Sequence, residues 1–288
     1  MRKRLRDKLK EALSPEQLSR VYSSFDIIGD IAIIKHNKVQ NPEAVAKQIM
    51  AVHRNIKTVL TPATRIEGDF RIRELRYLAG ENKTSTSHKE SGCIFRLDVE
   101  KCYFSPRLSF EHLRIAGLVR CGETVVNMFA GVGCFSIIIA KTQSQSKVYS
   151  IDVNPTAVQY MEENIKTNKV NDMVFPIFGD SKEIIQTQTQ LQGVADRVLM
   201  PLPEKALEYL PYALLALKKT GGWIHYYDFQ HASGKENPVE KTKIKVAQEL
   251  DRLGICYMFV NSRVMRPTGP NWYQTVLDIQ VAALPNKF

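Results

Sequence analysis

The chain has 288 residues, enough for one large domain or two of ordinary size, and its hydrophobic content of 44% is normal for a protein with a buried core. No apolar run reaches the roughly 18 residues that span a bilayer, and the basic start lacks a signal-peptide pattern, so the cytoplasm is the expected location. The net charge of +10 favours a polyanionic partner, and five separated cysteines without a C-x-x-C pair indicate neither a zinc site nor a disulfide framework.

The first predicted element is a basic amphipathic helix over residues 1–20, where leucines recur at i, i+4 spacing. Basic residues are also frequent further along the first half of the chain. They are Arg65, Arg71, Arg73, Arg76, Lys83, Lys89, Arg107, Arg114 and Arg120. This concentration of charge indicates a surface that binds phosphate groups.

Residues 21–110 carry mixed signals and are expected to form a small α+β domain. Alternating apolar residues at 30–35 and 93–99 indicate half-buried strands. Residues 42–54 predict a helix with proline in its first turn. The polar, basic stretch 80–92 is typical of a loop or hairpin.

Residues 111–288 alternate between helix and strand patterns, which predicts a parallel sheet covered by helices on both faces. The fold class is therefore α/β and Rossmann-like. Two strand-like runs at 254–267 and 271–284 end the chain, so the sheet is expected to close with an antiparallel hairpin. Strands are predicted at 123–131, 147–153, 173–180, 195–203 and 221–229, and helices at 111–119, 134–141, 155–168 and 204–217.

Polar and glycine residues follow three of these strands at the points where the strands end. Asn127, Gly131 and Gly133 mark the turn from the first strand into the first helix, where the backbone must turn tightly near a ligand. Asp152 ends the next strand and is placed to accept hydrogen bonds from ribose hydroxyls, and Asp180 ends the third strand near an adenine amino group. The sequence therefore predicts a nucleotide-type pocket at the carboxyl edge of the sheet.

Two cofactors compete for this pocket. A dinucleotide site prefers G-x-G-x-x-G, but Ser136 occupies the position of the third glycine. The closing hairpin and the prolines after the fourth strand, Pro201 and Pro203, favour S-adenosylmethionine instead.

Three stretches, 68–115, 125–137 and 196–210, closely resemble the archaeal- and eukaryotic-type tRNA guanosine-37 N1-methyltransferases, and the resemblance covers about residues 25–288. It implies a class I methyltransferase domain preceded by a small domain that grips the anticodon loop and stem of tRNA. Many members carry a further N-terminal domain, which is expected here to be absent or reduced to the basic helix.

The resemblance also implies catalytic roles. Glu111 matches the proposed general base and Arg71 the arginine that contacts the target guanine, while Tyr103 matches an aromatic residue of the active site. Guanine N1 carries a proton, so its methylation needs a base and a cation near O6, but no metal. Arg73, Arg107 and Arg114 are expected to bind the tRNA.

On the cofactor side, the resemblance implies that Asp152 binds ribose and that Pro203 belongs to an Asn-Leu-Pro motif. Phe129 and Val153 are added to the expected cofactor site. The sequence departs from the family at three positions: Asn127 replaces an acid, Pro201 replaces the asparagine of the motif, and His112 replaces an arginine after Glu111.

Three alternatives remain open. The chain could transfer the aminocarboxypropyl group of the same cofactor, or methylate a wybutosine precursor at the same tRNA position. It could also be an inactive tRNA-binding protein, because Asn127 and Pro201 alter two motifs. His88, His225 and His231 have no ligand spacing and receive no role.

Overall fold

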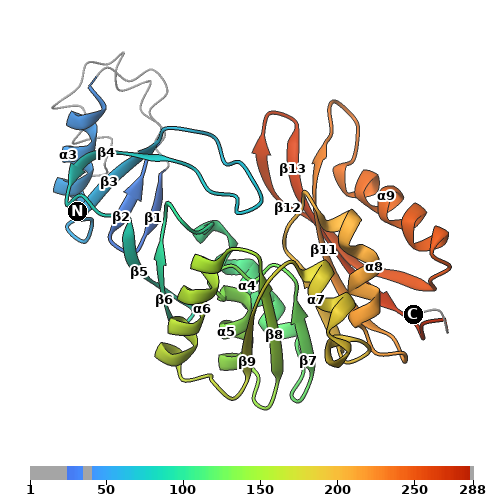
Figure 1. The fold of residues 1–288 in the computed structure, drawn as a ribbon. Coiled ribbons are helices and arrows are strands. Elements are labelled where there is room, and N and C mark those ends of the chain that lie inside the picture. Colours follow the sequence, from blue (N-terminus) through green and yellow to red (C-terminus); the bar gives the residue numbers. More distant parts are fainter. Residues whose placement is uncertain (1–24, 35–40, 286–288) are drawn as a thin grey trace. The chain divides into compact units, whose positions relative to one another are not determined.

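A computed structural model describes residues 25–34 and 41–285 of the chain. The chain divides into two compact units, the first ending at Glu111 and the second starting at His112 (Figure 1). The helix predicted at residues 1–20 lies outside the described residues.

The first unit contains a four-stranded sheet with the order β1-β2-β3-β4. The strands β2 and β3 are parallel and are joined by α3, whereas the two outer pairs are antiparallel. The side chain of Asn41 accepts a hydrogen bond from the backbone N–H of Ala44 and so caps α3. Val45 and Ile49 bury the apolar face of this helix in the core of the unit. The elements are β1 (Asp26–Ile28), β2 (Ile31–Ile33), α3 (Pro42–Val52), β3 (Thr58–Pro62) and β4 (Leu75–Gly80).

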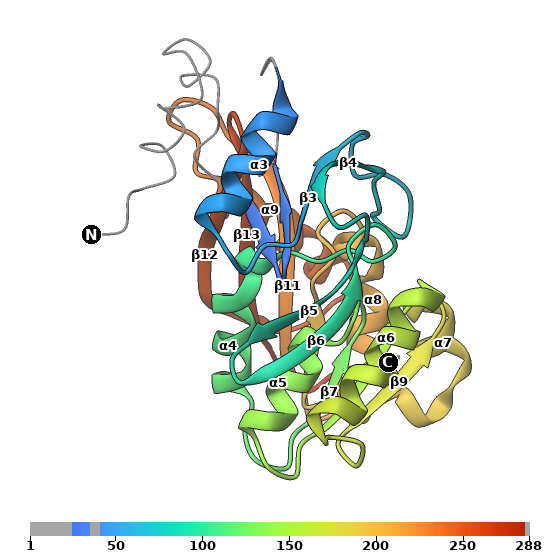
Figure 2. The same ribbon diagram turned by 90° about the vertical axis from the view of Figure 1, so that its left-hand side faces the viewer.

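A separate hairpin follows, formed by β5 (Ser85–Glu90) and β6 (Cys93–Asp98) (Figure 2). Ser91 and Gly92 both have positive φ angles, 49° and 76°, as a two-residue type I′ turn requires. The hydroxyl of Thr86 donates a 2.7 Å hydrogen bond to Asp30 and so ties the hairpin to the β1–β2 turn. Of the two forms predicted for residues 80–92, loop or hairpin, the structure has the hairpin.

The second unit contains a seven-stranded sheet with the order β12-β13-β11-β10-β7-β8-β9. The five strands from β11 to β9 are parallel, and β13 pairs antiparallel with both β11 and β12. The predicted parallel sheet with a closing antiparallel hairpin is therefore confirmed. The strands are β7 (Thr124–Asn127), β8 (Lys147–Asp152), β9 (Val174–Phe178), β10 (Arg197–Met200), β11 (Gly222–His231), β12 (Tyr257–Gly269) and β13 (Trp272–Val281).

Helices lie on both faces of this sheet (Figure 1). Four of them correspond to predicted helices: α4 (Ser109–Leu118), α5 (Cys134–Thr142), α6 (Pro155–Asn168) and α8 (Ala206–Ala216). Two helices were not predicted, α7 (Ser181–Thr187) and α9 (Pro238–Arg252). Short 3₁₀ turns occur at Pro106–Leu108 and Thr189–Leu191.

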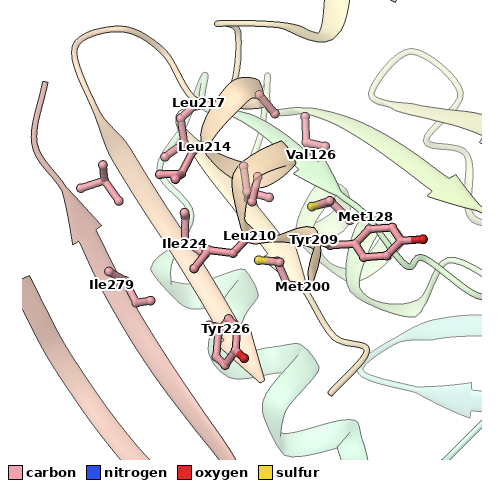
Figure 3. Packing of buried hydrophobic residues seen from close by; sticks show 14 of the residues in the cluster. Val126, Met128, Met200, Tyr209, Leu210, Leu214, Leu217, Ile224, Tyr226 and Ile279 are labelled. Carbon is pink, nitrogen blue, oxygen red and sulfur yellow. The ribbon is translucent and has the colours of Figure 1, made fainter. Parts of the chain in front are cut away.

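The main core of the second unit lies between the sheet and α8 (Figure 3). Val126, Val198 and Ile224 come from neighbouring parallel strands, and Leu210 and Leu214 come from the helix. All five are fully buried. Burial of each such side chain contributes about 1.5–3 kcal/mol to the stability of the fold. This packed core supports the ends of the strands, where a site can form.

Candidate functional site

The first part of the site is the glycine turn between β7 and α5. Gly131 and Gly133 have φ angles of 56° and 93°, a region that side-chain-bearing residues rarely adopt. A Cβ atom on Gly133 would also lie 3.0 Å from Met161 Cγ and 3.1 Å from Ile137 Cδ1. Both the backbone angle and the lack of space therefore require glycine at position 133.

Asp152 holds this turn from the end of β8. One carboxylate oxygen accepts a 2.6 Å hydrogen bond from the Gly131 N–H, and the other accepts a 2.9 Å hydrogen bond from the Asn154 N–H. Burial raises the pKa of Asp152, while these two backbone donors oppose that shift. Each carboxylate oxygen can still accept a second hydrogen bond, so Asp152 retains capacity for ribose hydroxyls. Val153 follows it directly and is half-buried.

Asn127 lies beneath the turn and has no exposed surface. Its Nδ2 donates a 3.2 Å hydrogen bond to the Ser136 hydroxyl, which in turn accepts a 2.7 Å hydrogen bond from Ser150. Its Oδ1 accepts a hydrogen bond from the Phe129 N–H at 3.4 Å. We therefore propose that Asn127 supports the turn, in place of the predicted contact with the cofactor.

Asp180 caps α7 at the end of the third strand. Its Oδ1 accepts a 2.8 Å hydrogen bond from the Lys182 N–H, and its Oδ2 accepts a 2.5 Å hydrogen bond from the Tyr209 hydroxyl. The Tyr209 ring packs against Phe129, with 5.2 Å between the ring centroids. Tyr209 thus links the first and third strand ends. The sequence analysis did not single out Tyr209, which lies within an apolar helical run.

The fourth strand, β10, ends at Met200 and is followed by the two prolines of the expected cofactor site. Pro201 is half-buried and Pro203 is buried. Because proline has no backbone N–H, only Leu202 can donate a backbone hydrogen bond in this segment.

The first unit gathers the other predicted residues around Tyr103. The Arg71 guanidinium lies over the Tyr103 ring, with Cζ 4.2 Å from the ring centroid. Arg71 closes a tight turn in which its N–H donates to the Gly68 carbonyl at 3.1 Å, and its φ angle is 53°. A left-handed conformation at an arginine is strained, and such strain concentrates at functional sites.

Asp26 connects two further arginines to this cluster. Arg107 Nε donates a 2.8 Å hydrogen bond to Asp26. Burial lowers the pKa of the Arg73 guanidinium, and the nearby Asp26 and Tyr103 raise it. Arg71, Arg73, Tyr103 and Arg107 are therefore brought together in one unit. Asp26 was not predicted, because nothing near it in the sequence indicates that it meets residues that follow much later.

Glu111 and Arg114 lie one turn apart on α4. Glu111 is 2% exposed and occupies the first turn of the helix, where the helix dipole favours a carboxylate. Arg114 donates from both terminal nitrogens to Asp278 on β13, at 2.6 and 3.0 Å. We therefore propose a structural role for Arg114 in place of the predicted contact with tRNA. His112 is buried and packs edge-on against Phe135 at 4.4 Å.

Within residues 25–34 and 41–285, no helix is both long enough and apolar enough to span a membrane. The same residues contain no group of three or more His, Cys, Asp or Glu side chains that could hold a metal ion.

Two protein-family models match the chain. The TRM5/TYW2 methyltransferase domain matches residues 86–253, which is more than half of the chain. The TYW2 N-terminal domain matches residues 5–84.

Curated relatives of this chain are named for different activities at position 37 of tRNA. The tRNA (guanine(37)-N(1))-methyltransferase Trm5b of Pyrococcus abyssi is 42% identical over 272 residues, 93% of this chain and 78% of that protein. The tRNA 4-demethylwyosine(37)-methyltransferase Taw21 of Saccharolobus solfataricus is 36% identical, over 90% of this chain and 94% of that protein. The tRNA(Phe) (4-demethylwyosine(37)-C(7)) aminocarboxypropyltransferase of Methanocaldococcus jannaschii is 37% identical, over 87% and 95%.

A solved structure of the complex of aTrm5 and tRNALeu is similar to this chain with a TM-score of 0.83 and 31% identity. The similarity covers 98% of this chain and 79% of that one.

Proposed function

Because the chain belongs to the TRM5/TYW2 methyltransferase family, we propose that it transfers the methyl group of S-adenosylmethionine to N1 of guanosine 37 in tRNA. The observation that carries the proposal is the presence, on one chain, of a glycine turn with strand-end carboxylates and of an arginine cluster around an aromatic ring. We also propose the cytoplasm as the location of this reaction.

The residues at the strand ends fit S-adenosylmethionine. Asp152 and Asp180 are the expected acceptors for the ribose hydroxyls and the adenine amino group. The Ser181 hydroxyl beside them is buried and has no hydrogen-bond partner among the described residues, as expected for a group that meets a ligand. When bound, the cofactor supplies an electrophilic methyl group on a sulfonium.

Glu111 is the proposed general base. It would accept the N1 proton of guanine, which makes N1 a nucleophile and places negative charge on O6. Glu111 lies in the first turn of α4. Arg71 would donate to O6 and offset the developing charge.

The arginine cluster is the proposed tRNA contact. Guanosine 37 must leave its stack to reach a catalytic group, and a splayed base is held by stacking and by hydrogen bonds to its edges. Tyr103 offers a ring for stacking, and Arg73 and Arg107 offer positive charge for neighbouring phosphates of the anticodon loop and stem.

The position of transfer tests this function. An unmodified tRNA transcript with guanosine 37 and a matched transcript with adenosine 37 are incubated with methyl-labelled cofactor. We expect label only in the first transcript, because adenine carries an amino donor where guanine O6 would accept a hydrogen bond from Arg71. Equal labelling of both transcripts would contradict the proposal.

A second candidate is supported by the relatives named for wybutosine chemistry, which are 36% and 37% identical and are covered over 94% and 95% of their length. In this case the substrate would be 4-demethylwyosine at position 37, and either a methyl or an aminocarboxypropyl group would be transferred. To separate the two candidates, a tRNA that carries this precursor is offered together with the guanosine 37 transcript. The mass of each tRNA after the reaction shows which of the two was modified.

A further inference from the structure

A network of buried charged groups lies in the second unit and has no part in the chemistry proposed above. His225 on β11 is fully buried, and its Nδ1 lies 2.5 Å from Asp278 on β13. Its Nε2 lies 2.6 Å from Nη1 of Arg197 on β10. Nε of Arg197 donates a 2.9 Å hydrogen bond to the Glu123 carboxylate. At the other end of the network, Arg114 on α4 donates its two hydrogen bonds to Asp278.

The contacts fix the protonation of His225. Arginine nitrogens only donate hydrogen bonds, so Nε2 of His225 must accept from Arg197. Nδ1 therefore carries the hydrogen and donates it to Asp278. The imidazole is neutral, and the network contains two guanidiniums and two carboxylates, so its charges balance without solvent.

Both guanidiniums of the network act on the helix α4. Arg114 fastens the middle of the helix to β13, and Nη2 of Arg197 donates a 3.0 Å hydrogen bond to the carbonyl of Leu118 at the helix end. A cation at that carbonyl satisfies an orphan acceptor and complements the helix dipole. Gln143 adds a 3.1 Å hydrogen bond to the carbonyl of Ala116. The position of α4 along and around its axis is thus set by directional bonds.

Apolar packing can hold a helix without the free-energy cost of desolvating buried charges. Hydrogen-bonded charges are more directional than apolar contacts. Glu111 lies three residues before Arg114 and therefore on the same side of α4. We propose that the Arg114–Asp278–His225–Arg197 network is a positioning device that sets the carboxylate of Glu111 for removal of the N1 proton. This inference rests on the proposed function, because it concerns the group which that function uses as base.

A double-mutant cycle tests the proposal through single-turnover methyl transfer, with Asp278→Asn, Glu111→Gln and the combined variant. Asp278→Asn replaces an acceptor of the network with an amide. We expect it to slow transfer at least tenfold in the wild-type background and less than twofold in the Glu111→Gln background. Cofactor affinity should be unchanged in all variants, because in the described part of the chain Asp152 and Asp180 have hydrogen-bond partners outside the network.

Arg114→Lys serves as a second variant in the same cycle, since it keeps the charge and loses the two-pronged contact. Asp228→Asn is the matched control. Asp228 lies on β11, as His225 does, but it is paired with Lys245 of α9 and is 2% exposed. Its effect on the rate should combine multiplicatively with that of Glu111→Gln.

The outcomes separate the inference from the function beneath it. One outcome is that Glu111→Gln is slow and that Asp278→Asn and Arg114→Lys slow this variant by the same factors as they slow the wild type. The network is then structural, and the inference is overturned. If Glu111→Gln transfers methyl at the wild-type rate, the general base itself is wrong and both statements fall.

Discussion

One residue of the proposed active site has an unfavourable backbone conformation. Arg71 occupies a left-handed backbone conformation and is kept there by the turn at Gly68 and by the face of the Tyr103 ring. Such a conformation costs about 1–3 kcal/mol and persists only where its surroundings fix it. The guanidinium is therefore ordered before a substrate arrives.

Glu111→Gln should reduce single-turnover methyl transfer by about 10²–10⁴-fold, because the amide cannot accept the N1 proton. Affinities for tRNA and cofactor should be nearly unchanged, since the variant keeps the size of the side chain. Glu43→Gln on α3 is a control that removes a carboxylate from the first turn of another helix. A Glu111→Gln enzyme that melts earlier but transfers methyl at the wild-type rate would exclude the base role.

Asp152→Ala should weaken S-adenosylmethionine binding, measured by calorimetry, and leave tRNA binding by filter assay almost unchanged. The variant removes the proposed ribose acceptor, the hydrogen bond that holds the glycine turn at Gly131, and the hydrogen bond from the Asn154 N–H. Asp172→Ala, in the connection between α6 and β9, is the control for loss of a carboxylate nearby in the sequence. An unchanged cofactor affinity would refute the placement of the pocket.

At the scale of elements, the sequence predicted the parts whose patterns are local. The parallel strands, the glycine turn and the strand-end acids follow from alternation and spacing. The helix α9 was missed although its sequence carries the signals: Asn237 and Pro238 mark a helix start, and Val246 and Leu250 lie four residues apart on its buried face. Contacts between distant strands could not be predicted: His225 and Asp278 are 53 residues apart and meet only through the register of β11 and β13.

His225 makes stability depend on pH. Burial lowers the pKa of His225, and the nearby Arg197 and Arg114 lower it further against the opposing effect of Asp278. The unfolded chain takes up this proton near pH 6.5, whereas the folded chain resists it, so the free energy of unfolding should fall as pH drops below about 6.5.

His225→Gln keeps a donor for Asp278 and an acceptor for Arg197 but cannot titrate. Between about pH 6.5 and 5, its free energy of unfolding should fall less steeply than that of the wild type, by up to about 1.4 kcal/mol per pH unit. Asp152 and Asp228, whose pKa values burial raises, act in the opposite direction in both proteins and cancel in the comparison. Urea denaturation at several pH values in this range measures the free energy of unfolding of both proteins. The same pH dependence in the wild type and the variant would contradict the account.

At the scale of the whole molecule, the net charge is +10, and the basic side chains are not paired with acidic ones to the same extent in every element. On α9 the lysines are paired with acids: Lys241 with Glu236, Lys243 with Glu240 and Lys245 with Asp228. The first unit also contains ion pairs, such as Arg107 with Asp26, but it gathers several arginines around the Tyr103 ring, and Arg65 and Lys89 are exposed. The phosphate-binding surface is therefore expected on the first unit.

The affinity for tRNA should fall steeply between 50 and 200 mM salt, by about 0.7–0.9 log units per log unit of salt for each phosphate contacted. Arg73→Ala and Arg107→Ala should each reduce this slope by about that amount. Arg252→Ala on α9, which lies outside the proposed surface, should leave the slope unchanged. A slope that is flat in the wild type, or insensitive to the first two variants, would show that tRNA binds elsewhere.

The identity of the modified nucleoside tests the central claim most directly. Unmodified tRNA with guanosine 37 is incubated with the protein and S-adenosylmethionine, digested to nucleosides, and analysed by chromatography with mass spectrometry. The account predicts 1-methylguanosine, located at position 37 by fragment mapping. A nucleoside carrying an aminocarboxypropyl group, a methyl group on another atom of guanine, or an unmodified guanosine 37 would contradict it.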